Sequence, residues 1–305
     1  MGGKLIIAGG NLSYCAAMIH RRLIEYAGGA DAKLAIIPTA SGQDPASTIE
    51  YVKELWIKLG ADPSNIIVLP VYGEEGKGWR EPALGDEGSI LNMLEGITGA
   101  WFTGGDQYYV HKAFVRKDGS DTKALEYLKK VFRNGGVIGG TSAGAAIMSE
   151  VMIASGDNAT ALSSPILYGY EDYDDSDESG EANLRIVKGL GFFTKGIIDQ
   201  HFDKRPRLFR LIRSLTDYGS NLHMGYGVSE DTAMVYDRET KNITVLGRGG
   251  VYIIDCSKAE KARDIDSVTV KNVVVNVIKE GDLYNHLGNI FLFGDSQLGS
   301  KEGIS

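Results

Sequence analysis

Ser142 lies at the centre of a G-x-S-x-G pattern that runs from Gly140 to Gly144. Two apolar residues lead into this segment and Ala145 to Met148 can continue as a helix, which predicts a strand, a sharp turn and a helix. A turn that exposes a hydroxyl at its tip needs close backbone approach, which glycine and alanine permit. Ser142 is therefore a candidate nucleophile. The alternative is an ordinary tight turn in which Ser142 only caps the helix.

A serine nucleophile needs a base that takes its proton and an acid that orients the base. His201 is the candidate base, because it follows an apolar strand and lies in the polar run Asp199-Gln200-His201. Glu230 is the candidate acid, because it follows the apolar strand at residues 224–228, and Asp231 is the second choice. For the other histidines we expect no catalytic role: a surface position for His20, a loop for His223, and structural positions for His111 and His286.

The three candidates follow one another along the chain as serine, histidine and acid. Esterases and lipases of the α/β-hydrolase type have the order serine, acid, histidine, so the sequence disfavours that class unless an acid of residues 171–181 takes part. Attack on a carbonyl by Ser142 creates an oxyanion, which needs hydrogen-bond donors. We expect the backbone N–H groups of Ala143 and Gly105 to form this oxyanion hole.

Short apolar strands alternate with helical stretches in the first half of the chain. The strands are expected at residues 5–8, 34–37, 66–69 and 99–103, and the helices at residues 16–26, 48–59 and 123–132. This alternation predicts a parallel sheet, whose ligand site lies beyond the carboxyl ends of its strands. The strand ends at Gly9, Thr39, Gly104 and Ser142 are therefore expected to meet at one site. We expect a single α/β catalytic domain over residues 1–305, of which about 233–305 is a β-rich extension.

The composition suits a large folded domain and disfavours nucleic-acid partners. Of the 305 residues 43% are hydrophobic, and the formal net charge is −8, whereas binders of nucleic acids or anionic membranes need a basic face. Cys15 and Cys256 have no metal-type spacing, and nothing requires a disulfide between them. No apolar run reaches the ~18 residues that span a bilayer. We expect a cytoplasmic protein, or a secreted one whose signal peptide has been removed.

The segment from Glu171 to Glu181 carries seven carboxylates in eleven positions. Its composition favours a solvated surface loop. The alternative is a negative collar that attracts cationic substrate.

Four short blocks, in this order, resemble cyanophycinases. They are residues 102–107, residues 139–145, residues 199–202 with the arginines that follow them, and residues 230–233. The resemblance is strongest from about Gly99 to Tyr236. It implies a serine peptidase with a flavodoxin-like or class I glutamine-amidotransferase-like α/β fold, related to aspartyl dipeptidase. Characterised cyanophycinases hydrolyse cyanophycin, a poly-aspartate whose side chains are capped with arginine, to β-aspartyl-arginine dipeptides.

The resemblance implies the same three catalytic residues that the residue types suggest. It also implies a set of substrate-binding residues: Gln107, Asp199, Gln200, Arg205, Arg207 and Arg210. Guanidinium groups can bind substrate carboxylates in bidentate fashion, and Asp199 can bind a guanidinium or orient a neighbouring side chain. Arg213 follows Arg210 by three positions, and we expect it to be a solvated helix residue.

The residue types predict a serine hydrolase without metal or cofactor. The resemblance implies a peptidase that acts on aspartyl or isoaspartyl peptides through an acyl-enzyme, with cyanophycin as the leading substrate, and it implies a homodimer. Two alternatives are an aspartyl or isoaspartyl dipeptidase of the same family and a catalytically inactive peptide-binding relative. The chain departs from the family pattern in the acidic segment Glu171 to Glu181 and at two single positions. Asn11 stands where an acidic residue is expected after the glycines, and Ser229 stands where an aspartate usually precedes the catalytic glutamate.

Overall fold

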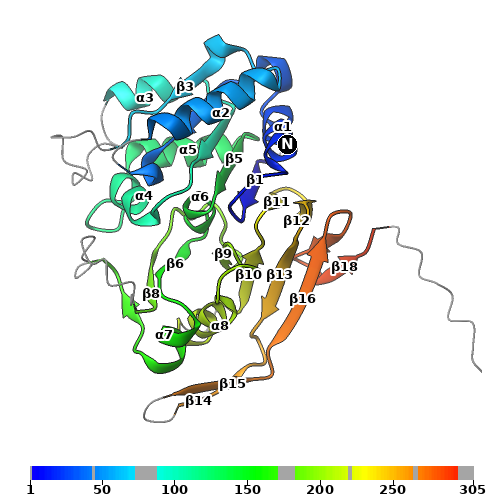
Figure 1. The fold of residues 1–305 in the computed structure, drawn as a ribbon. Coiled ribbons are helices and arrows are strands. Elements are labelled where there is room, and N and C mark those ends of the chain that lie inside the picture. The colour runs from blue at the N-terminus through cyan, green and yellow to red at the C-terminus, as the bar shows by residue number, and fades with distance from the viewer. Residues whose placement is uncertain are drawn as a thin grey trace, which may run out of the picture.

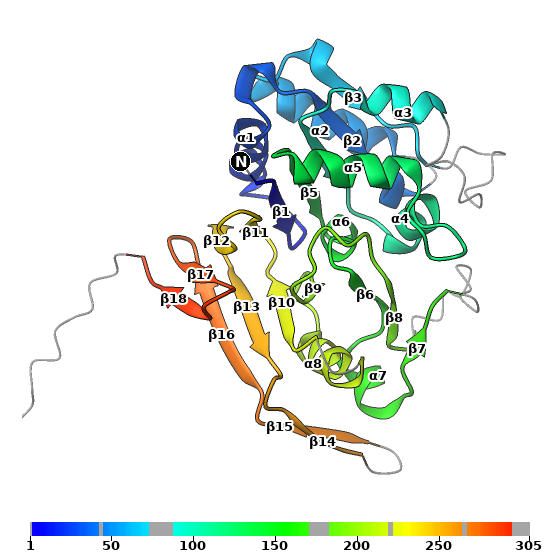
Figure 2. The same cartoon turned by 180° about the vertical axis from the view of Figure 1, so that it is seen from behind.

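The computed structural model describes residues 2–42, 45–72, 88–170, 183–218, 222–263 and 267–294. Its largest element is a nine-stranded sheet (Figure 1 and Figure 2). Across the sheet the strands are β18 (Ile290–Leu292), β17 (Leu283–Asn285), β12 (Asn242–Gly247), β11 (Thr232–Asp237), β1 (Lys4–Ala8), β5 (Val137–Thr141), β4 (Gly99–Phe102), β2 (Leu34–Ile37) and β3 (Ile66–Val68). The last five strands, from β1 to β3, are parallel to one another. The first four, from β18 to β11, pair antiparallel with their neighbours, and β11 pairs antiparallel with β1.

Helices cover both faces of the parallel strands, which explains why these strands read as continuous apolar runs. One face packs against α1 (Ala16–Tyr26) and α2 (Ala46–Lys58), with Trp101 of β4 in the contact. The other face packs against α3 (Gly88–Leu94), α4 (Gln107–Phe114) and α5 (Lys123–Arg133). The predicted α/β sandwich with a parallel sheet is confirmed, and the further strands toward the C-terminus join both this sheet and a second one.

The second sheet has four strands and lies beside the carboxyl ends of the first (Figure 1). Its strands are β16 (Val274–Lys279), β13 (Gly250–Asp255), β10 (Met224–Val228) and β9 (Ile197–Asp199). β9 and β10 are parallel neighbours, so their carboxyl ends lie together. These are the two strands that His201 and Glu230 follow, which places both residues outside the main sheet.

Smaller elements complete the described part of the chain. α6 (Ala143–Ala146) follows Ser142. α7 (Asn158–Ser163) packs against α8 (Leu208–Asp217), which in turn packs against β9 and β10 of the second sheet (Figure 2). The small sheets consist of β6 (Val151–Ser155), β8 (Arg185–Lys188) and β7 (Leu167–Tyr168), and of β14 (Glu260–Arg263) with β15 (Val268–Lys271). The acidic segment Glu171–Glu181 lies outside the described residues. Within them no helix is both long and apolar enough to cross a membrane.

The start of α8 shows how a distant residue sets a helix boundary. Pro206 suggests a helix that begins beside it, but the helix begins at Leu208. The side-chain Oδ1 of Asn158 accepts hydrogen bonds from the N–H groups of Phe209 (2.8 Å) and Arg210 (3.2 Å). The helix N-terminus is thus capped from α7 rather than by a residue that precedes it in the chain.

Candidate active site

Ser142 occupies a strained turn between β5 and α6. Its φ of 54° and ψ of −115° lie in a region that non-glycine residues rarely adopt, at a cost of about 1–3 kcal/mol. The motif requires small residues beside Ser142 because neighbouring backbone atoms leave no room for larger side chains. A Cβ on Gly140 would lie 2.4 Å from the carbonyl oxygen of Gly144, and one on Gly144 would lie 2.3 Å from that of Phe102. The sequence therefore holds the serine at the tip of a turn that larger residues would disrupt.

The three catalytic candidates form one hydrogen-bonded chain. Ser142 Oγ lies 2.9 Å from His201 Nε2, and His201 Nδ1 lies 2.6 Å from Glu230 Oε1. With Nδ1 donating to the carboxylate, Nε2 is free of a proton and can accept one from the serine hydroxyl. This arrangement brings together one residue that follows a strand of the main sheet and two that follow strands of the second sheet. A hydroxyl, an imidazole and a carboxylate hydrogen-bonded in this order match the geometry that serine hydrolases use.

The loop after β1 joins the two sheets at this point. The N–H of His201 donates to the carbonyl of Gly9 (2.7 Å), and the N–H of Asp231 donates to that of Gly10 (3.1 Å). A Cβ on Gly10, whose φ is +113°, would lie 2.3 Å from His201 Cε1. The glycine pair therefore allows the imidazole to approach Ser142.

Asn11 is a site residue that sequence reasoning missed. Its Nδ2 donates to Glu230 Oε2 at 2.8 Å, while Ser13 Oγ donates to Asn11 Oδ1 at 2.7 Å. The family pattern predicts an acidic residue here, but a carboxylate beside Glu230 could not donate this hydrogen bond. Asp203 is a second such residue, because its Oδ1 accepts the N–H of Glu230 at 2.8 Å. The sequence offered one indication for Asn11: it follows a glycine pair at the end of a strand, where site residues of a parallel sheet are expected.

The electrostatics of the site favour a neutral base and an ionised acid. Burial lowers the pKa of His201, and the positive charges of Arg205 and Arg207 lower it further, whereas the hydrogen bond that His201 donates to Glu230 raises it. The hydrogen bond from Asn11 holds the pKa of Glu230 below its ordinary value, and the bond to His201 adds to this. His201 therefore remains able to accept a proton in mildly acidic solution.

We expect kcat/KM for peptide hydrolysis to fall as the pH falls through the pKa of His201, with a midpoint below the value of about 6.5 of an ordinary histidine. Below that midpoint the base already carries a proton and cannot take the one on Ser142. Arg205→Gln removes a positive charge and is expected to move the midpoint to higher pH, whereas Lys258→Gln, at an exposed turn, should leave it in place. Initial rates over a pH series test this. A wild-type midpoint above about 6.5 would contradict it.

The two expected oxyanion donors belong to the residue after Ser142 and to the loop after β4. Ala143 is the first residue of α6, and neither its N–H nor that of Gly105 has an acceptor in the described part of the chain. Gly105 has a φ of +139°, and a Cβ there would lie 1.7 Å from the carbonyl oxygen of Ala40. Gly104 approaches the nucleophile, because its Cβ would lie 3.3 Å from that of Ser142. The ends of β2, β4 and β5 therefore converge at the nucleophile.

Most of the predicted substrate-binding residues are buried and already paired. Asp199 forms a bidentate ion pair with Arg210, with N–O distances of 2.8 and 2.5 Å. Arg207 donates to the carbonyl of Gln200 at 2.5 Å and lies 3.7 Å from Asp199; burial lowers the pKa of Arg207 to about 10. The Oε1 of Gln200 is buried and has no partner in the described part of the chain. The carboxylate of Asp199 is thus paired with arginine side chains of the protein itself.

Gln107 and Arg205, the other two predicted substrate-binding residues, are not buried. The amide of Gln107, on α4, donates to the carbonyl of Ala154. The side chain of Arg205 is exposed to solvent next to His201. Arg205 is consequently the member of the set that is most accessible to a substrate carboxylate.

Two predictions about charged or polar residues on helices are wrong. Arg213 was expected to be solvated, but it is 1% exposed, pairs with Asp217 at 2.7 Å and donates to the carbonyl of Ala161 at 2.7 Å. His20 was expected at the surface, but it is 2% exposed and its Nδ1 accepts the indole N–H of Trp56 at 2.9 Å. Both side chains are buried because a second helix packs over them, which helical periodicity within one segment does not show.

A cavity of about 530 Å³ opens beside Ser142 and His201, on the face of the sheet that α1 and α2 cover. None of the six predicted substrate-binding residues lines it. Among the residues described, no group of three or more histidine, cysteine, aspartate or glutamate side chains is placed to hold a metal ion. Cys15 and Cys256 are both free thiols.

Comparison with known proteins agrees with this site. The chain matches peptidase family S51 over residues 5–244. A cyanophycinase from Geminocystis herdmanii is 30% identical over 287 residues, which cover 92% of each chain. One from Trichormus variabilis is 27% identical, covering 92% of this chain and 84% of its own. The crystal structure of a peptidase from an acI-B1 actinobacterium has the same fold, with a TM-score of 0.63 and 19% sequence identity. The match covers 93% of this chain and 97% of the other chain. The chain therefore belongs to peptidase family S51 and is a serine-type peptidase similar to cyanophycinases.

Proposed function

We propose that this protein hydrolyses cyanophycin to β-aspartyl-arginine dipeptides, with Ser142 as nucleophile, His201 as base and Glu230 as the acid that orients it. The observation that carries the proposal is the continuous chain of hydrogen bonds from Ser142 Oγ through the imidazole to the Glu230 carboxylate. The similarity to curated cyanophycinases over 86–92% of the chain supports the choice of substrate.

In the proposed mechanism, Ser142 Oγ attacks an aspartyl carbonyl while His201 Nε2 takes its proton. The N–H groups of Ala143 and Gly105 stabilise the oxyanion of the tetrahedral intermediate. His201 then gives the proton to the leaving amine as the C–N bond breaks, which leaves an ester on Ser142. Water attacks this ester, again with His201 as base, and releases the acid product and the free serine. Glu230 stays ionised and stabilises the imidazolium.

The charged residues around Asp199 support recognition of an aspartyl substrate. The carboxylate of Asp199 balances one of the two buried guanidinium groups beside it, so a net positive charge remains near Arg207. With the exposed Arg205, this charge favours a substrate carboxylate close to the scissile bond. Because the formal net charge of the protein is −8, this positive region is local, and we propose peptide rather than nucleic-acid partners. We also propose a homodimer, as the family resemblance implies.

The experiment that tests the proposal is incubation of the purified protein with cyanophycin, followed by mass spectrometry of the soluble products. We expect β-aspartyl-arginine with the wild type and none with Ser142→Ala. Absence of this dipeptide from both reactions would exclude cyanophycin as the substrate.

The second candidate is an aspartyl or isoaspartyl dipeptidase of the same family. It is favoured by the size of the cavity beside Ser142, about 530 Å³, which is in the range of pockets that hold small molecules. Such an enzyme would hydrolyse dipeptides rapidly and leave the polymer intact. Assays of the same purified protein on dipeptides and on cyanophycin therefore distinguish the two functions. A catalytically inactive binding relative would bind both and hydrolyse neither.

A further inference from the structure

A cavity of about 200 Å³ lies at the edge of the main sheet opposite to the catalytic residues. Tyr236 of β11 and Arg238, which follows that strand, line it, and Tyr236 pairs with Leu5 near the amino end of β1. Ser142 instead follows β5, whose last residue pairs with Ala8 at the carboxyl end of β1. The length of β1 therefore separates this cavity from the nucleophile.

Three positively charged side chains line the cavity. Lys195 belongs to the loop before β9, and Arg238 and Lys241 belong to the turn between β11 and β12. The side chains of Lys195 and Arg238 form no hydrogen bond or ion pair in the described part of the chain, and Lys241 donates to the carbonyl of Arg238. The other described residues that line the cavity are uncharged: Phe132, Phe192, Thr194 and Tyr236. Like charges around one small cavity repel one another, and an anion between them relieves this repulsion.

The two acids of the same turn are bound by other groups. Asp237 pairs with Lys4 at 2.5 Å and also accepts the backbone N–H of Glu239 at 2.8 Å. The carboxylate of Glu239 accepts the N–H of Gly2 at 2.7 Å. The turn therefore directs its acids to partners outside the cavity and its two basic residues into the lining.

Tyr236 adds a neutral hydrogen-bond donor to the three cations. The residue is 4% exposed, and its ring packs edge to face against Phe193 with the centroids 5.1 Å apart. Burial raises the pKa of Tyr236, so its hydroxyl keeps the proton in neutral solution. This hydroxyl has no hydrogen-bond partner in the described part of the chain. A polar group on a side chain buried to this extent normally has a partner, and an oxyanion in the cavity would supply the acceptor.

We propose that this cavity binds a doubly charged oxyanion, either inorganic phosphate or the phosphate group of a small monoester. Lys195, Arg238 and Lys241 hold it, and Tyr236 donates a hydrogen bond. Ammonium groups bind phosphate as point charges and guanidinium groups bind it in bidentate fashion. A cyanophycin segment matches the cavity less well, because each of its arginines brings a guanidinium together with a carboxylate and no described lining residue is an acid. The site goes beyond the proposed function and does not depend on it.

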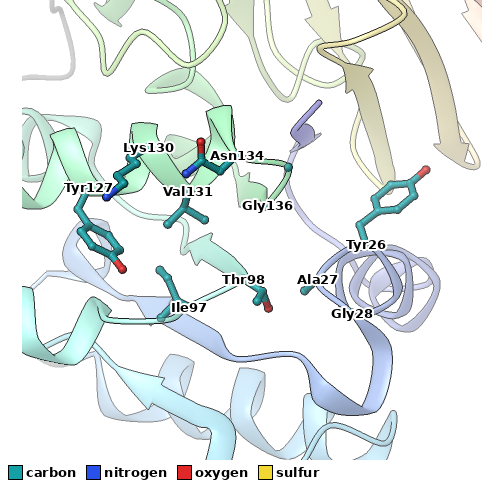
Figure 3. Close-up of a pocket in the computed structure, with 11 residues that line it drawn as sticks. Tyr26, Ala27, Gly28, Ile97, Thr98, Tyr127, Lys130, Val131, Asn134 and Gly136 are labelled. Carbon is teal, nitrogen blue, oxygen red and sulfur yellow. The ribbon is translucent and has the colours of Figure 1, made fainter. Parts of the chain in front are cut away.

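A second hollow of the molecule provides a control site. It measures about 440 Å³ and lies at the amino ends of β4 and β5, which is also away from Ser142 (Figure 3). Lys130 of α5 is among its lining residues, and its ammonium group lies 6.0 Å from the centroid of the Tyr127 ring. Lys130→Gln therefore removes one exposed positive charge from the same edge of the sheet without changing the proposed anion site.

Isothermal titration of the wild type with sodium phosphate tests the site. The pH is held above the second pKa of phosphate, and chloride keeps the ionic strength constant. We expect saturable binding at one site with a Kd of about 1 mM, and binding of acetate that is at least ~10-fold weaker because acetate carries a single charge. Lys195→Gln and Arg238→Gln should each weaken phosphate binding by about 10-fold. Lys130→Gln should leave it unchanged.

Tyr236→Phe is a second variant that keeps the packing of the ring and removes only the hydroxyl. It should weaken phosphate binding by a smaller factor than the loss of a charge, about 2- to 10-fold. Circular dichroism without phosphate checks that each variant is folded. Titration with glycerol 3-phosphate distinguishes the two sources, because tighter binding of this ligand than of inorganic phosphate indicates a monoester and weaker binding indicates the free ion.

The absence of saturable binding up to about 20 mM phosphate would overturn the site. So would equal binding of acetate and phosphate, or an equal loss of affinity with Lys130→Gln and Arg238→Gln, since both results indicate only general surface charge. Hydrolysis of cyanophycin by Arg238→Gln is measured in parallel and should match the wild type. A selective loss of hydrolysis would assign the cations to the polymer and contradict the phosphate site. If the wild type hydrolyses no cyanophycin, the proposed function fails while the titration still decides the anion site.

Discussion

Ser142→Ala is expected to lower kcat for peptide hydrolysis by about 10⁵- to 10⁶-fold, because the variant has no nucleophile and the residual rate comes from the oxyanion donors and substrate binding alone. Alanine keeps the Cβ of serine, so the strain of the backbone at Ser142, whose φ is 54°, should change little and the fold should survive. Initial rates on cyanophycin and on aspartyl dipeptides measure the loss, with circular dichroism to check folding.

The matched control for this change is Ser163→Ala. Ser163 is an exposed serine at the end of α7 and its hydroxyl donates to the carbonyl of Ala159 within that helix. Its removal should leave kcat unchanged. A Ser142→Ala variant that retained more than about one hundredth of the wild-type rate would exclude Ser142 as the nucleophile.

Glu230→Gln is expected to lower kcat by about 10³- to 10⁴-fold while the protein remains folded. Glutamine matches glutamate in shape, but its amide can donate to His201 Nδ1 and so favour the tautomer with the proton on Nε2. That nitrogen faces Ser142 Oγ at 2.9 Å and could then no longer accept the serine proton. The variant also lacks the negative charge that stabilises the imidazolium.

Substrate affinity and rate should respond differently to this change. If Glu230 acts through His201, kcat falls and binding of peptides to the enzyme changes little. Glu126→Gln, at an exposed position on α5, serves as the control and should retain the wild-type rate. A Glu230→Gln variant with near-normal kcat would leave Asp231, the second choice, as the acid to test.

Local features of the site follow closely from the sequence. The G-x-S-x-G pattern predicts the turn at Ser142, and the apolar periodicity predicts α1 with the bounds Ala16–Tyr26 that the structure has. Apolar strands that end in glycine or polar residues predict where functional groups emerge. Such predictions succeed because the conformation of a turn or a helix depends mainly on the residues within it.

Contacts between distant segments could not be predicted in this way. Ser142 and His201 are separated by 59 positions and His201 and Glu230 by 29, and nothing in either strand shows that β9 and β10 leave the main sheet for a second one. The hydrogen bond from Asn11 to Glu230 spans 219 positions. Such pairings depend on which strands become neighbours.

The sequence by itself determined the parallel α/β sandwich, the strained serine turn and the candidate histidine and glutamate. Only the tertiary structure decided that the loop at Gly9 and Gly10 joins the two sheets, that Asn11 binds the acid, and that His20 and Arg213 are buried. The physical reason is that backbone conformation and apolar periodicity are local properties. Burial, hydrogen-bond partners and the pKa of a side chain are instead set by the segments that pack against it.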